Sequence, residues 1–163
     1  VKETTQLSRT LVASEAALIY AEHLRRTPEL FGADVLARLR DEGGASAVEY
    51  ARARRAQALA AWQMERLFEE YDLLIAPCTP MIGARLDDES AKAMARARLS
   101  AFTAYFNMAG VPSLSLPCGF SAQGLPIGLQ LVAPYGAEAH LLRAAFAYEQ
   151  ATQWSARAPA LAV

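Results

Sequence analysis

The chain has 163 residues, of which 53% are hydrophobic and 20% are charged. That length is near the usual size of one domain, and this hydrophobic fraction is ample for a core. The formal net charge of -1 argues against nucleic acid or an anionic membrane as a partner, because phosphate binding needs clustered positive charge. No apolar run approaches the roughly 20 residues needed to cross a bilayer, and the first residues do not form a signal peptide.

The first part of the chain has helical spacing. Residues 6–26 predict an amphipathic helix that ends at Thr27, because the residue before a proline avoids the α region. A short helix is expected near residues 35–39. Ser46 is interpreted as an N-cap, since its hydroxyl can accept a backbone N–H. The helix that follows over residues 46–71 has apolar residues on more than one side, which predicts burial against more than one layer.

The second part alternates between strands and helices. A strand is expected over residues 72–77, a loop over 81–90 and a helix over 91–108. Two further strands, 113–118 and 127–133, are apolar nearly throughout, a pattern typical of a sheet with helices on both faces. We predict one α/β unit over the whole chain.

Small and rigid residues mark the turns in this second part. Gly110 is placed to end a helix in a left-handed conformation, and Pro112 prevents the helix from resuming. Residues 121–124 have turn composition. Gly128, inside an apolar strand, indicates a close backbone approach. Gln130 in the same strand needs hydrogen-bond partners, which we expect neighbouring backbone to supply.

Residues 104–135 read AYFNMAGVPSLSLPCGFSAQGLPIGLQLVAPY. This segment resembles the C-terminal part of the amidase signature family of amide hydrolases, in which N-(L/M)-A-G-x-P-(A/S)-x-S-x-P-x-G is followed by G-L-P-(I/V)-G-L-Q. Residues 72–80 are similar to the family's D-x-(L/I)-x-x-P-(T/C)-x-P stretch, and residues 138–154 to its final helix. Residues 15–71 follow the family less specifically. The resemblance implies a mixed β-sheet covered by helices, with residues 1–163 as the C-terminal segment of a larger amidase domain.

The resemblance implies hydrolysis of a carboxylic amide to an acid and ammonia. In the family a lysine acts as base, a bridging serine relays the proton and a second serine attacks the carbonyl, and this Ser-cis-Ser-Lys triad lies in the N-terminal half. Residues 43–46 look similar to its loop but lack the serines and glycines that follow. Neither Lys2 nor Lys92 stands in an S-x-x-K arrangement. We expect no catalytic residue here, an inactive isolated chain, and a role in the sheet core and pocket wall.

Three residues are candidates for substrate binding. Thr79 follows a predicted strand, where ligands bind in α/β sheets, although a turn-stabilising hydroxyl is an equal alternative. The resemblance implies that the A subunits of tRNA-dependent amidotransferases hold glutamine with an arginine before the long helix and an aspartate seven residues ahead of the Asn-x-Ala-Gly motif. Arg38 matches the arginine, but the aspartate position falls on Ser100, which carries no charge. This departure favours an amidase for a smaller or less polar amide.

No cofactor or metal is expected. The two histidines stand alone on helical patterns, without a second ligand at metal-binding spacing. Cys78 and Cys118 form no C-x-x-C pair and are interpreted as reduced, largely buried thiols of a cytoplasmic protein, with a disulfide between them as the alternative.

The expected partners of the intact enzyme are a small-molecule amide, the missing N-terminal half and a second copy of the chain. A segment of a larger sheet exposes a strand edge that pairs readily with other chains. A non-catalytic binding or structural module is the competing hypothesis, and a segment from the A chain of a tRNA-dependent amidotransferase is another. The residues expected nearest the uncovered surface are Leu114, Leu116, Ile127, Leu129 and Leu131.

Overall fold

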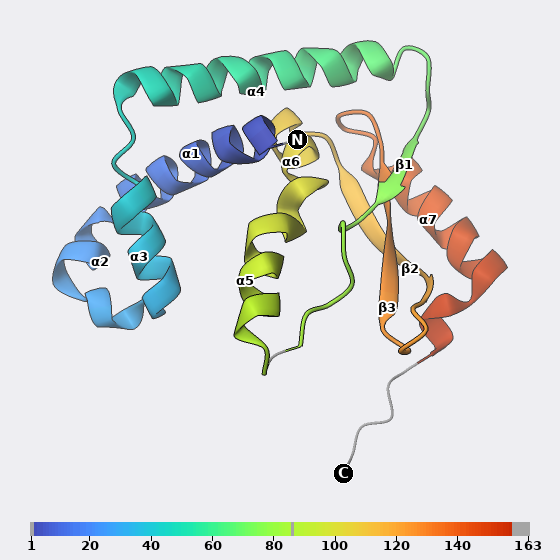
Figure 1. Cartoon of the computed structure of the whole chain (residues 1–163). Helices are drawn as coiled ribbons and strands as arrows, with labels where there is room; N and C mark the ends of the chain where they lie inside the picture. Colours follow the sequence, from blue (N-terminus) through green and yellow to red (C-terminus); the bar gives the residue numbers. More distant parts are fainter. Residues whose placement is uncertain (1, 86, 158–163) are drawn as a thin grey trace. The chain divides into compact units, whose positions relative to one another are not determined.

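The computed structural model describes residues 2–85 and 87–157. The chain divides into two compact units, residues 1–60 and residues 61–163. Figure 1 labels the helices and strands in chain order. Whether the whole chain acts as one α/β unit stays a prediction.

The first unit is helical. It contains α1 (Lys2–Ile19), α2 (Ala21–Arg26), a 3-10 turn at Pro28–Leu30, α3 (Ala33–Glu42) and the first part of α4 (Ala47–Leu67). The helix predicted over residues 6–26 is therefore two helices, separated at Tyr20, whose ring packs edge-on against Phe31 at 5.8 Å. Its end at Thr27 is as expected.

Close packing joins α1 to α3 within this unit. Gly43, which follows α3, has no room for a side chain, because a Cβ there would lie 2.6 Å from the Cβ of Ala17. The hydroxyl of Tyr50 on α4 donates a hydrogen bond to Glu15 on α1 at 3.1 Å. These contacts fix the turn from which α4 begins.

The N-cap predicted at Ser46 is confirmed. Its Oγ accepts the backbone N–H of Glu49 at 3.2 Å, and the Glu49 carboxylate accepts the Ser46 N–H at 2.8 Å and its hydroxyl at 2.7 Å. This reciprocal capping box satisfies donors that the first turn of a helix leaves unpaired. The same hydrogen bonds hold the pKa of Glu49 below its ordinary value.

The second unit contains a three-stranded sheet of β1 (Leu74–Pro77), β2 (Ser113–Phe120) and β3 (Pro126–Val132) in the order β1-β3-β2. Both pairs are antiparallel, and a register shift follows Pro117 on β2. Helices packed on a sheet confirm the predicted α/β class. The described strands form no parallel pair, so that part of the implied mixed sheet is not seen here.

The helix predicted over residues 91–108 is broken in the structure. It consists of α5 (Glu89–Arg98), a 3-10 turn at Leu99–Ala101 and α6 (Ala104–Ala109). Serine and threonine have lower helix propensities than the alanines of α5, which favours a break at this point. Gly110 ends α6 with φ 74°, as predicted.

One face of the sheet packs against α7 (Glu138–Thr152), which Figure 1 shows beside β2. The expectation that the sheet leucines lie at an uncovered surface is wrong, because this helix covers them: Leu116 and Leu131 are buried, and Leu114 and Leu129 pack against the same cluster. Ile127 does stay exposed. The other members of the buried cluster are Ala133, Leu141 and Ala145.

Candidate functional site

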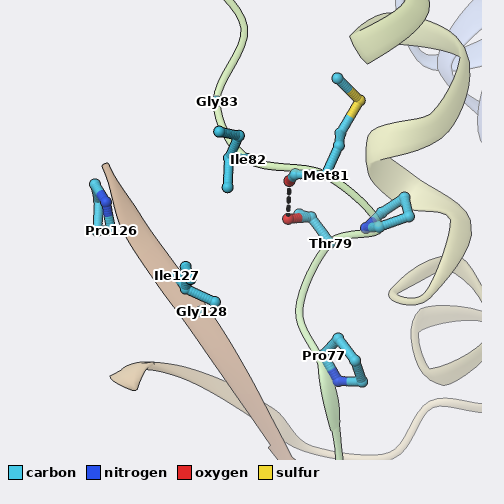
Figure 2. A pocket seen from close by; sticks show the side chains of 9 residues that line it. Pro77, Thr79, Met81, Ile82, Gly83, Pro126, Ile127 and Gly128 are labelled. Atoms are coloured by element: carbon cyan, nitrogen blue, oxygen red, sulfur yellow. Dashed lines mark hydrogen bonds between the residues drawn. The ribbon is translucent and has the colours of Figure 1, made fainter. Parts of the chain in front are cut away.

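The candidate site is a small pocket between the loop that follows β1 and the first residues of β3. Its volume is about 210 Å³. Figure 2 shows Thr79 in the loop on one side and Ile127 on the strand on the other. The lining residues are Pro77, Thr79, Pro80, Met81, Ile82, Gly83, Pro126, Ile127 and Gly128.

The backbone of Gly128 anchors this loop to the sheet. Its carbonyl oxygen accepts the N–H of Cys78 at 3.0 Å, which extends the pairing of β1 with β3 by one residue. A Cβ at Gly128 would lie 3.0 Å from the Cβ of Cys78 and 3.1 Å from Oγ of Ser115. The close approach predicted from sequence is confirmed, and it brings Thr79 to the pocket wall.

The hydroxyl of Thr79 donates a hydrogen bond to the carbonyl oxygen of Met81 at 2.7 Å, drawn as a dashed line in Figure 2. The turn-stabilising role considered for Thr79 is therefore present. A hydroxyl has one proton but two acceptor lone pairs. Its oxygen can still accept an N–H from a bound amide.

The other two candidates occupy different elements. Ser100 is half-buried in the 3-10 turn between α5 and α6 and does not line the pocket. Arg38 is exposed on α3 of the first unit. The sequence predicts only a loop over residues 81–90 and gives no sign of the pocket, although the apolar Met81 and Ile82 directly follow Thr79 and Pro80.

No serine in the described ranges hydrogen-bonds to lysine or histidine, as a nucleophile and its base would. Lys92 pairs instead with Glu89 on α5, and Ser46 is committed to its capping box. Residues 2–85 and 87–157 also contain no cluster of metal-binding side chains. Cys78 and Cys118 are both free thiols, although each is half-buried rather than largely buried.

Gln130 departs from expectation. It is buried on the central strand with 3% of its surface exposed, but its Oε1 has no hydrogen-bond partner among the described residues. The expected pairing with neighbouring backbone is therefore wrong for this oxygen. In antiparallel register Gln130 lies between Ala76 and Ser115.

The family model named Amidase matches residues 3–142. The chain belongs to the Amidase family. This confirms the amidase signature resemblance that residues 72–80 and 104–135 carry. Within the described residues, no helix is long and apolar enough to cross a membrane.

The chain is similar in sequence to A subunits of glutamyl-tRNA(Gln) amidotransferases. The chain is 46% identical over 114 residues to the A subunit of glutamyl-tRNA(Gln) amidotransferase from Moorella thermoacetica, covering 70% of this chain and 23% of that protein. The corresponding protein from Synechococcus elongatus is 35% identical over 152 residues, covering 90% of this chain and 32% of that protein.

Solved structures of the family have the same fold. A crystal structure of an amidase superposes with a TM-score of 0.79 and 26% identity, covering 91% of this chain and 35% of that one. The 6-aminohexanoate cyclic dimer hydrolase in complex with substrate gives a TM-score of 0.70 and 27% identity, covering 96% of this chain and 36% of that one. The chain thus spans about a quarter to a third of the length of these relatives.

Proposed function

We propose that this chain is the C-terminal part of a serine-dependent amidase that hydrolyses a carboxylic amide to an acid and ammonia. The observation that carries the proposal is the family match over residues 3–142. The Ser-cis-Ser-Lys triad then comes from residues outside this chain, and the present residues contribute the sheet core and one wall of the substrate pocket.

The pocket beside Thr79 favours an apolar acyl group. Among the described lining residues none is charged, and Thr79 supplies the only side-chain hydroxyl. At about 30 Å³ for each group the size of a water molecule, the pocket holds roughly seven non-hydrogen atoms. A short branched acyl group or a phenyl ring fits this volume, with the substrate's amide N–H on the Thr79 oxygen.

A glutamine-hydrolysing amidotransferase is the second candidate, and the 46% identity to the Moorella protein favours it. Free glutamine carries an ammonium and a carboxylate, which need partners of opposite charge when they leave water. Arg38 would serve the carboxylate in this case. Ser100, in place of the aspartate that the resemblance implies, leaves the ammonium without a counter-charge.

The deciding experiment measures ammonia release by the protein at its natural length from benzamide, isobutyramide and glutamine. We expect the two apolar amides to have the higher kcat/KM. Thr79→Val should raise KM for benzamide about fivefold, the effect of one neutral hydrogen bond, and Thr79→Ser should restore it. Preference for glutamine, abolished by Arg38→Gln, would establish the second candidate instead.

The isolated 163-residue chain should release no ammonia, because a serine without an adjacent base is a weak nucleophile. Release by highly purified chain that is lost on changing Ser46 or Ser115 would overturn this expectation. If mass measurement showed that the naturally expressed protein has only 163 residues, that result would support the hypothesis of a non-catalytic module.

Partners of the chain follow from surfaces it leaves uncovered. Among the described strands, β1 and β2 each have an unpaired edge. Large apolar side chains are also exposed, including Ile75 on β1 at 70% and Phe146 on α7 at 62%. We propose that the remainder of the protein covers these edges and that a second copy completes a homo-oligomer. The two free thiols fit the proposed cytoplasmic location.

A further inference from the structure

A second and larger cavity lies where the β2–β3 hairpin meets the chain after α7. Its volume is about 530 Å³, within the range of small-molecule sites. Of the described residues, only Pro126 lines both this cavity and the Thr79 pocket. The other side chains used below are Pro117, Phe120, Trp154, Ser155 and Arg157.

The chain reverses after α7 to build the wall of this cavity. Gln153 has φ 53°, the one positive value at a residue other than glycine in residues 2–85 and 87–157. Its N–H caps the helix by donating to the Glu149 carbonyl at 2.9 Å. This left-handed residue leads into a 3-10 turn, Trp154–Ala156, which packs against β2. A left-handed residue is a common helix ending, and here it turns the chain back toward β2.

Two aromatic rings and one cation come together at the wall of this cavity. The rings of Phe120 and Trp154 lie 6.2 Å apart at 60°, and the guanidinium of Arg157 sits 5.1 Å from the centre of the Phe120 ring. Two prolines, Pro117 and Pro126, complete the apolar lining. The described lining is thus mostly apolar, with the exposed side chain of Arg157 as its one charge.

Arg157 has no carboxylate partner within the described part of the chain, where the ion pairs involve other residues. The cation–π contact with Phe120 places the guanidinium beside the ring and pairs none of its N–H donors with a carboxylate. A planar fork of donors matches the two oxygens of a carboxylate. Ser155 adds a hydroxyl to the same lining.

We propose that this cavity binds an organic carboxylate with an aromatic body. The carboxylate accepts hydrogen bonds from Arg157, and the ring packs against the cavity side of the Phe120 and Trp154 pair. At about 30 Å³ per group, the cavity has room for roughly eighteen non-hydrogen atoms, so a phenyl-substituted short acid fits with space to spare. The site does not depend on the proposed amidase activity.

The test is calorimetric titration of the protein at its natural length with 3-phenylpropanoate and with the neutral alcohol 3-phenylpropanol. Arg157→Gln should weaken binding of the acid at least tenfold, which is the lower end of the effect of a hydrogen bond to a charged group. It should leave the affinity for the alcohol unchanged. Arg157→Lys should have an affinity for the acid between those of the wild type and Arg157→Gln, because lysine keeps the positive charge but lacks the planar pair of N–H donors. Arg143→Gln, an exposed change of the same charge on α7, is the matched control.

Equal weakening by Arg157→Gln and Arg143→Gln would reduce the effect to net charge and overturn the proposal, as would no saturable binding of the acid below about 10 mM.

Residues 158–163 follow Arg157 directly and contain no acidic side chain. Replacing them with glycine and serine should leave the affinity unchanged. Binding that appears only after this replacement would show that the chain's own residues fill the cavity. Binding at the Thr79 pocket would be insensitive to Arg157, so failure of the amidase assignment does not alter these outcomes.

Discussion

Gly128→Ala is expected to destabilise the protein by about 2 kcal/mol. The added methyl would lie 3.0 Å from the Cβ of Cys78 and 3.1 Å from Oγ of Ser115. Favourable contacts between carbon atoms fall at about 3.5–4.0 Å, so both neighbours must shift. Cys78 directly follows β1, and its N–H bonds to the Gly128 carbonyl, so its Cβ cannot shift without disturbing that pairing. Oγ of Ser115 on β2 can turn away only by changing its side-chain rotamer. Overpacking of this kind costs about 1–3 kcal/mol.

The assay is thermal unfolding followed by circular dichroism. For a chain of this size each kcal/mol shifts Tm by about 2–4 °C, so Gly128→Ala should lower Tm by about 4–8 °C. Gly83→Ala is the matched control, since Gly83 lines the same pocket and has nothing within 4 Å of its Cβ position. Ser115→Ala removes one of the two clashes and should restore part of the loss. Equal Tm values for the two alanine variants would refute the reasoning.

Gly110→Val should cost about 1–3 kcal/mol, because φ 74° is poorly tolerated by a β-branched residue, and an unchanged Tm would count against it. Ser46→Ala should cost about 1 kcal/mol in urea unfolding through loss of the N-cap. Because the pKa of Glu49 lies below its ordinary 4.5 in the folded chain, the difference from wild type should be full above that pH and shrink as pH falls through the lowered pKa; a pH-independent difference would exclude this linkage. Gln130→Met should leave stability unchanged or raise it by about 1 kcal/mol, since it removes a buried acceptor without a partner, whereas a loss above that size would mean that Oε1 is satisfied. The isolated chain should sediment as a dimer, larger assembly or aggregate; a stable monomer that binds no hydrophobic dye would contradict the uncovered edges.

The helix ends and the close backbone contact were predictable from sequence because each depends on a single residue. Gly110, the Ser46 cap and the crowded Gly128 each follow from what one side chain permits. The strands were also predictable, since their apolar runs are short and bounded by turns. In the second half of β3 three successive residues, 130–132, are buried, which matches the expectation of cover on both faces there.

Features that depend on partners distant in sequence were not predictable. The cover that α7 gives the leucines of β2 and β3 depends on tertiary packing. The pocket residues Met81 and Ile82 lie in an apolar dipeptide, which by itself does not distinguish a pocket wall from a core. The role of Arg38 depends on which group of the substrate it contacts, and no pattern within the 163 residues indicates that group.

The strand order has a consequence for synthesis. Among the three described strands, β3 is synthesised last and is the central one, so β1 and β2 have no partner among these strands until β3 arrives. At about 5–20 residues per second, β1 waits roughly 3–10 seconds for the residues about 50 positions later with which it pairs. The hairpin of β2 and β3 closes locally within microseconds of emergence. Slowing translation between residues 78 and 125 would therefore delay the pairing of β1 with β3 without delaying the hairpin once its residues have been synthesised.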